Sequence, residues 1–179
     1  MGPFSLVSKV LAVLYFRQQP VELPVRTTSI NPPGKATFNE IAVSPNGKVL
    51  VFTATSDDKR QLWVRPLHAI TANVLAGTEH ATDPFWSPDS SWIGFFADGK
   101  LKKIEAAGGT AQTLCDATNT RGGSWGADGI IVFAEFNSGL FRVSAKGGVP
   151  AAFTTQDKNK RDIYHRWPVF LPDGRTTFT

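Results

Sequence analysis

The sequence has a single cysteine, Cys115, among 179 residues, and only three histidines. One cysteine excludes an intrachain disulfide and leaves the redox compartment open. The histidines, at positions 68, 80 and 165, are scattered, so the chain has no zinc or iron ligand spacing. The acidic residues of its turns stand alone and lack the alternating oxygen ligands that calcium needs. We therefore predict no metal site and no cofactor.

The sequence also lacks a long hydrophobic run. Residues 3–16, PFSLVSKVLAVLYF, are mostly apolar, but Lys9 interrupts them. A membrane helix needs about 20 apolar residues, and no small-residue cleavage site follows. Two interpretations stay open: the end of a membrane helix, or a poor signal anchor or unrelated hydrophobic start. We expect a hydrophobic helix over residues 1–17, able to anchor the chain through 3–16. A proline-rich linker and lead-in strand over 18–40 would follow.

Positive charge is in small excess, and the formal net charge is +4. The densest basic cluster, at 158–161, is flanked by Asp157 and Asp162 and has no aromatic residues beside it. Nucleic-acid surfaces combine a continuous basic patch with stacking aromatics. We interpret the cluster as a solvated loop and predict no nucleic-acid partner.

Aromatic and turn-forming residues are plentiful, with 13 Phe, 5 Trp, 16 Gly and 12 Pro. Many aromatics between many turn residues favour short strands and an all-β domain. A repeated turn supports this. Four segments align on Asn46, Asp89, Asp128 and Asp173: VSPNGKVLVF at 43–52, WSPDSSWIGF at 86–95, WGADGIIVF at 125–133 and FLPDGRTTF at 170–178.

A second register has a compatible period. Three segments align without gaps: LWVRPLHAITANVL at 62–75, LKKIEAAGGTAQTL at 101–114 and LFRVSAKGGVPAAF at 140–153. The residue pattern of each unit predicts four short strands, and the second of them is an apolar run. A four-stranded repeat of roughly 40–45 residues is a propeller blade, and its aromatics fill the space between blades.

The predicted fold is therefore an all-β β-propeller of four-stranded antiparallel blades. About three and a half blades are present, as units 41–83, 84–122, 123–165 and an incomplete 166–179. Because propellers close with four to eight blades, we expect a partial ring and an incomplete chain. Further blades or another chain would complete the ring.

The segment GGSWG at 122–126 matches the G-x-S-x-G pattern of a serine hydrolase. A nucleophile elbow needs a strand, a sharp turn at the serine and a helix directly after it. Ser124 is followed instead by a turn and by the apolar strand at 130–133. We predict that Ser124 is not a nucleophile, that no residue is catalytic and that this chain is not an enzyme.

The turn motifs PFWSPD at 84–89, VSPNG at 43–47 and FLPDG at 170–174 resemble those of the TolB-like, WD-like β-propeller family of bacterial envelope proteins. The resemblance covers about residues 41–179, and the third unit departs from it with Gly126-Ala127 in place of Ser-Pro. It implies a periplasmic or extracytoplasmic, non-catalytic binding or scaffold module. Its ligand would be a protein, a peptide or a small molecule, with a protein or peptide partner expected.

Two alternatives follow from closer resemblances. Residues 26–52, after a hydrophobic stretch, look like the junction in bacterial receptor-type serine/threonine kinases, where a membrane helix precedes an extracytoplasmic propeller. The chain has no kinase Gly-rich loop, H-R-D or D-F-G motif, so it would be the sensor region of a membrane-anchored kinase. Ser-Pro-Asp-Gly turns also occur in the N-terminal propeller of prolyl-oligopeptidase-type serine peptidases.

The loops that enter the first strand of each blade would lie at one mouth of the channel. Polar residues that differ from unit to unit occupy these loops. We predict ligand-binding residues there at Asp83, Arg121, His165 and Arg166.

Overall fold

The computed structural model describes residues 36–156, 165–171 and 173–179. The predicted hydrophobic helix at 1–17, most of the segment 18–40 and the basic cluster lie outside these residues. Within the described part, no helix is long and apolar enough to cross a membrane.

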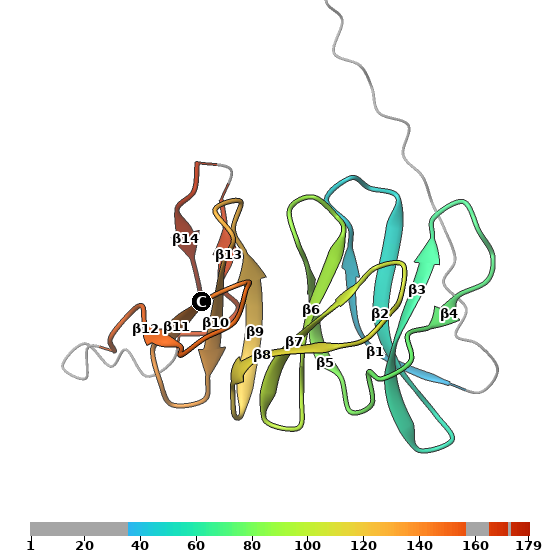
Figure 1. The fold of residues 1–179 in the computed structure, drawn as a ribbon, viewed down its shortest axis with the longest axis horizontal. Coiled ribbons are helices and arrows are strands. Elements are labelled where there is room, and N and C mark those ends of the chain that lie inside the picture. Colours follow the sequence, from blue (N-terminus) through green and yellow to red (C-terminus); the bar gives the residue numbers. More distant parts are fainter. Residues whose placement is uncertain (1–35, 157–164, 172) are drawn as a thin grey trace, which may run out of the picture. The chain divides into compact units, whose positions relative to one another are not determined.

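The described residues form short antiparallel strands in four sheets (Figure 1). The first sheet consists of β1 (Thr37–Val43), β2 (Val49–Ser56), β3 (Lys59–Pro66) and β4 (Asn73–Val74). The second consists of β5 (Thr82–Trp86), β6 (Trp92–Ala97), β7 (Lys100–Glu105) and β8 (Gln112–Asp116). The third consists of β9 (Thr120–Trp125), β10 (Ile130–Glu135), β11 (Leu140–Ser144) and β12 (Ala151–Ala152). The fourth pairs β13 (Val169–Phe170) with β14 (Thr176–Thr177).

Each sheet follows the order of the chain, so every unit is a four-stranded meander or the beginning of one. The first strands contact one another from sheet to sheet, β1 with β5, β5 with β9 and β9 with β13. We call these four the inner strands. This arrangement is that of propeller blades, and it confirms the predicted all-β propeller with three blades and part of a fourth.

The second strands form the centre of each blade because their side chains are apolar on both faces. Phe52, Phe95 and Phe133 are fully buried in β2, β6 and β10. A strand covered on both faces reads as a continuous apolar run rather than as an alternating one. The hairpins after these strands turn on residues with positive φ, such as Asp98 at 53° and Gly99 at 71°, as type I′ turns require.

The repeated Ser-Pro-Asp turn is held by its own side chains. Ser87 Oγ accepts the Trp92 N–H at 2.8 Å and donates to the Asp89 carboxylate at 2.5 Å, which also accepts the Ser91 N–H at 3.0 Å. The hydrogen bond from Ser87, and then that from the Ser91 backbone, lower the pKa of Asp89. Ser44 and Asn46 repeat the arrangement one blade earlier. The turn acids are therefore structural.

The departure of the third unit from this motif has a steric reason. A Cβ on Gly126 would lie 2.9 Å from the Phe170 ring of the following blade and 2.6 Å from the Asp128 carboxylate. A serine does not fit there without movement of its neighbours. Asp128 keeps its own role and accepts the Ile130 N–H at 3.1 Å.

Neighbouring blades pack through aromatic rings over glycines. A Cβ on Gly94 would lie 2.3 Å from the Phe85 ring, and one on Gly123, in the next blade, 2.7 Å from the same ring. Trp86 Nε1 also donates to the Ala42 carbonyl at 3.2 Å, joining the second blade to the first. As predicted, these aromatics fill the space between blades.

The inner strands carry a recurring irregularity. Pairing of β5 with β6 shifts register between Thr82 and Phe85, and β9 and β10 shift at the equivalent place. Asp83 has φ of 47°, Gly122 of 87° and Trp167 of 50°, each six residues before the acid of its turn. One extra residue in a strand leaves the ladder locally and re-aims its side chain.

The sheets begin a little before the predicted units. β1 begins at Thr37, within the lead-in segment, while the predicted boundaries at 83/84 and 122/123 fall inside β5 and β9. The bulge accounts for this difference, because the polar residues before it look like a loop although they already pair with the second strand.

Candidate functional site

A cavity of about 480 Å³ lies where the inner strands enter their blades. We call it the inner-strand cavity. Three blades contribute charged residues to it, because Glu40 belongs to β1, Asp83 to β5 and Arg121 to β9. Its charged and aromatic lining also includes Arg60, His80, Asp98 and Trp167. The volume is in the range of small-molecule sites.

Asp83 lies among charges of both signs. Burial, and then the charge of Glu40, raise the pKa of the Asp83 carboxyl to about 6, while Arg121 and Arg60 act in the opposite direction. Glu40 is held in place by Thr53, whose hydroxyl donates to the Glu40 carboxylate and accepts the Glu40 N–H. A carboxyl with a perturbed pKa in a cavity marks a candidate functional residue.

The two arginines of the cavity make few polar contacts. Arg60 Nη2 donates to the His80 carbonyl at 3.4 Å, and its buried Nε has no hydrogen-bond partner. Arg121 Nη1 donates to the Thr120 carbonyl at 2.8 Å, and its guanidinium lies 5.1 Å from the centre of the Phe136 ring. Among the described residues, no carboxylate lies within ion-pair distance of either guanidinium.

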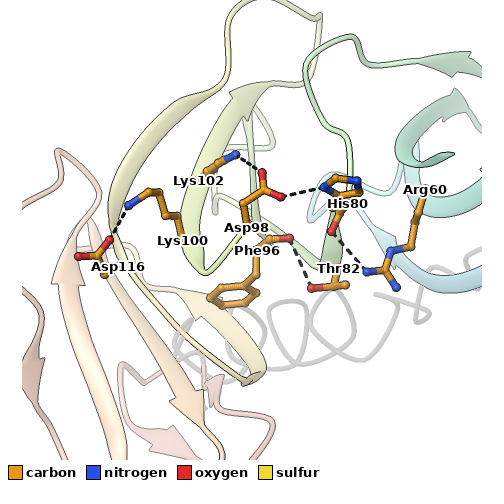
Figure 2. Close-up of polar contacts among 8 residues, drawn as sticks. All are labelled: Arg60, His80, Thr82, Phe96, Asp98, Lys100, Lys102 and Asp116. Atoms are coloured by element: carbon orange, nitrogen blue, oxygen red, sulfur yellow. Dashed lines mark hydrogen bonds and ion pairs between the residues drawn. The ribbon is translucent and has the colours of Figure 1, made fainter.

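Asp98, by contrast, is fully engaged. Figure 2 shows its carboxylate between His80 Nδ1, at 2.8 Å, and Lys102 Nζ, at 3.1 Å. The hydrogen bond with His80, and then that with Lys102, lower the pKa of Asp98. The same figure shows Lys100 paired with Asp116 at 2.6 Å, and neither residue lines the cavity. Asp98 and Asp116 of this second blade thus pair with Lys102 and Lys100, not with the arginines of the cavity.

The structure brings together two of the four predicted site residues. Asp83 and Arg121 line the inner-strand cavity, while His165 and Arg166 do not. His165 is buried, and its Nδ1 lies 2.6 Å from Thr154 Oγ1. Its ring is tilted against the Phe178 ring, with 4.3 Å between the ring centroids.

Arg166 exchanges backbone hydrogen bonds with Thr179, and its guanidinium lies over Phe136. The sequence analysis treated Asp83 and Arg121 as equivalent positions, and the structure shows that this alignment is displaced by one residue. Arg121 is equivalent to Thr82 and Arg166, whereas the counterparts of Asp83 are Gly122 and Trp167, which share its positive φ.

Trp167 is one of the cavity residues that the sequence analysis missed, together with Glu40, Arg60, His80 and Asp98. The residue is 52% exposed, and its backbone N–H donates to the Arg121 carbonyl at 3.0 Å. A Cβ on Gly122 would lie 2.6 Å from the indole, so the ring rests against that glycine. Counting six residues back from Asp173 would have found Trp167. Glu40 could be found in the same way from Asn46, but Arg60 could not, because it lies on a third strand.

A second cavity, of about 590 Å³, lies at the other end of the inner strands. Its lining is apolar, with Val43, Trp86 and Leu171 among its residues, and it includes Ser124. Ser124 Oγ accepts the Phe170 N–H at 3.1 Å and so joins two blades. None of the described residues lining this cavity is a histidine, carboxylate or lysine that could act as a base.

The described ranges contain no group of three or more His, Cys, Asp or Glu side chains arranged to hold a metal ion. Cys115 is buried, and burial raises the pKa of its thiol to about 11, so it is not an activated nucleophile. The residues of the inner-strand cavity can therefore interact with a ligand through charge pairing, hydrogen bonds and contact with an indole.

No family model matches the chain, and no curated protein matches it. Several solved structures are similar to it. A putative TolB from Agrobacterium tumefaciens is 17% identical with a TM-score of 0.64, covering 81% of this chain and 54% of that one. TolB from Acinetobacter baumannii is 14% identical with a TM-score of 0.65, covering 79% and 37%. Oligogalacturonate lyase from Vibrio parahaemolyticus is 14% identical with a TM-score of 0.62, covering 82% and 48%.

This chain thus spans about half or less of the length of the structures it resembles. At such identities the likeness concerns the fold, which the two TolB proteins share with an enzyme. It agrees with the resemblance inferred from the repeated turns: the chain has the fold of a TolB-like β-propeller.

Proposed function

We propose that this chain is a non-catalytic binding module that takes its ligand in the inner-strand cavity. The observation that carries the proposal is the convergence of charged side chains from three blades, Glu40, Asp83 and Arg121, on one cavity. Binding sites lie where a rigid scaffold presents polar groups from several elements to a concave surface.

The non-catalytic part of the proposal is supported by the placement of the two nucleophile candidates. Ser124 accepts a backbone hydrogen bond from the next blade, and the pKa of the Cys115 thiol is raised. An activated serine or cysteine needs an adjacent base. The likeness to an oligogalacturonate lyase does not transfer an activity, because a shared propeller fold hosts many functions.

We further propose an extracytoplasmic location with anchoring through residues 3–16. The hydrophobic character of that segment and the resemblance of residues 26–52 to a membrane-proximal junction support it. Fusion of a reporter active only outside the cytoplasm to residue 179 should give activity. Loss of membrane association after deletion of residues 1–17 would support the anchor, whereas unchanged fractionation would contradict it.

A ligand screen tests the binding function. The full chain is mixed with separate panels of peptides, sugars, sugar acids and nucleotides, and its melting temperature is recorded. We expect at least one compound to stabilise the chain, since a ligand selective for the fold raises its stability by mass action.

Arg121→Ala should abolish this shift, whereas Arg175→Ala is the matched control. Arg175 also belongs to a blade but pairs with Asp173 in a turn, outside the cavity. A stabilising compound whose effect persists in Arg121→Ala would place the binding elsewhere and contradict the proposal. Stabilisation by a protein or peptide would identify the partner class expected from the sequence.

A further inference from the structure

We infer that the inner-strand cavity takes a sugar acid, with Arg60 and Arg121 holding the ligand carboxylate and the indole of Trp167 contacting one face of its ring. This inference rests on the proposed function and names the chemical class of its ligand. Three observations carry it: guanidinium groups without carboxylate partners, an exposed aromatic ring beside them, and backbone strain at that ring.

The first observation concerns the distribution of ion pairs. Lys100, Lys102 and Arg175 each have a carboxylate within 3.1 Å. Arg60 and Arg121, which line the cavity, have none in the described part of the chain. The Arg60 Nε is buried without a hydrogen bond, and such a donor costs free energy unless a partner supplies the missing acceptor.

An arginine presents several N–H groups in a planar fork that matches the two oxygens of a carboxylate. Arg60 comes from β3 of the first blade and Arg121 from β9 of the third, and both are close enough to Asp83 to lower its pKa. Two guanidiniums that act on one carboxyl of the protein can act on a ligand carboxylate in the same space. Asp83 would then compete with the ligand for them.

The second observation is the indole of Trp167 at the edge of the cavity. Half of this residue is exposed, although tryptophan is usually well covered. It rests on Gly122, and its backbone is tied to Arg121. A fixed aromatic face beside two cationic groups suits a ligand that combines an apolar ring face with a carboxylate.

The third observation is backbone strain. Trp167 has φ of 50°, a left-handed conformation that is an outlier for a bulky residue. Glycine occupies the equivalent position 122 and adopts it without cost. Strained residues of this kind are kept where a side chain must be presented in a defined direction. The ring of Trp167 is such a side chain.

Calorimetric titration of the full chain at pH 7.5 tests the inference with four probes: D-glucuronate, D-glucose, acetate and N-acetyl-triglycine. We expect D-glucuronate to bind, and to bind at least about tenfold more tightly than D-glucose or acetate, because only glucuronate engages both the arginines and the indole.

Variants assign the contacts. Arg60→Gln and Arg121→Gln should each weaken glucuronate binding by at least about tenfold, as loss of a charge-assisted hydrogen bond does. Trp167→Asn keeps a residue that tolerates left-handed φ but removes the ring, and it should weaken glucuronate more than acetate. Asp83→Asn removes the competing carboxylate and should strengthen binding. Arg175→Gln is the control and should change nothing.

Several results would overturn the inference. Equal binding of glucuronate and glucose would remove the role of the arginines. Equal binding of glucuronate and acetate, with no effect of Trp167→Asn, would remove the role of the ring. Binding of N-acetyl-triglycine in preference, lost in Arg121→Gln, would replace the sugar acid by a peptide while leaving the proposed function in place. A compound bound equally by the chain and by Arg121→Gln would contradict the proposed function as well.

Discussion

Asp83 has both an unusual backbone conformation and a raised pKa. Its φ of 47° places it in the bulge of β5, and its carboxyl faces Glu40 from β1 and the arginines from β3 and β9. Burial outweighs the two arginines, so the carboxyl holds its proton up to a pH of about 6. Above that pH the ionised form costs the fold free energy.

Asp83→Asn should change how stability depends on pH. The raised pKa means that the fold binds a proton that the unfolded chain releases, so the free energy of unfolding falls as pH rises from about 4 to about 6. Asparagine tolerates positive φ and cannot ionise. We expect Asp83→Asn to be more stable than the parent above pH 6 by about 1 kcal/mol, after allowance for solvent screening at a partly exposed carboxyl.

Urea unfolding at pH 4 and pH 7.5 measures this difference. Asp173→Asn provides a control of opposite sign in a further measurement at pH 3, because hydrogen bonds from Arg175 lower the pKa of Asp173 and its stabilising effect is lost as pH falls below about 4. An Asp83→Asn chain with the same pH slope as the parent would show that Asp83 is not the titrating group.

Cys115 provides a second residue-scale prediction. Burial, and then the charges of Asp116 and Glu135, raise the pKa of its thiol to about 11. At pH 8 the thiol is therefore almost entirely protonated, and the thiolate is the reactive form. We expect a disulfide reagent to label the folded chain far more slowly than the chain in urea. Equal rates in both conditions would mean that the strand β8 opens readily.

At the scale of elements, the turn between the first and second strands is the unit that repeats. Ser87 and Asp89 in the second blade, and Ser44 and Asn46 in the first, satisfy backbone N–H groups that the tight turn leaves open. This is why the motif was visible in the sequence: its side chains are fixed by local hydrogen bonds, not by distant packing.

Ser87→Ala should therefore destabilise the protein. Ser87 is buried, and the variant leaves the Trp92 N–H without its acceptor, which costs about 1–3 kcal/mol. Ser144→Ala is the matched control, because Ser144 Oγ accepts only the exposed Lys146 N–H. Chemical denaturation of both variants gives the comparison. A loss for Ser87→Ala no larger than for Ser144→Ala would show that backbone hydrogen bonds alone hold the turn.

The sequence predicted the elements better than the site. Period, turn residues and apolar runs depend on neighbours along the chain, so β2, β6 and β10 were found where the structure has them. The bulge shifted the alignment of the preceding residues by one, which put His165 and Arg166 in the place of Trp167. Arg60 lies on β3, the third strand of the first blade, and lines the cavity through the fold of the chain, which no pattern of neighbouring residues predicts.

At the scale of the whole molecule, ring-to-glycine packing joins the second blade to the third, beside hydrogen bonds between blades such as those from Trp86 to Ala42 and from Phe170 to Ser124. Phe85 lies against Gly94 of its own blade and Gly123 of the next. Because interiors are close-packed, one added methyl group between two blades must displace the ring. The inner-strand cavity depends on this packing, since its residues come from different blades.

Gly123→Ala should cost about 1–3 kcal/mol of stability, because its Cβ would lie 2.7 Å from the Phe85 ring. Phe85→Leu shortens that side chain and should recover part of the loss in the double variant. A double-mutant cycle of unfolding free energies measures the coupling. Additive effects of the two substitutions would show that Phe85 does not join the second and third blades as described.

The left-handed residue of the inner strands makes recognition separable from architecture. The same backbone conformation carries aspartate in one blade, glycine in the next and tryptophan in the last. The backbone conformation determines the direction of the side chain, whereas the residue type at that position differs from blade to blade. Exchange of the residues at positions 83 and 167 is accordingly a route to a different ligand with the same blades, whereas position 122 stays glycine while Trp167 is present, because a Cβ there would lie 2.6 Å from the indole.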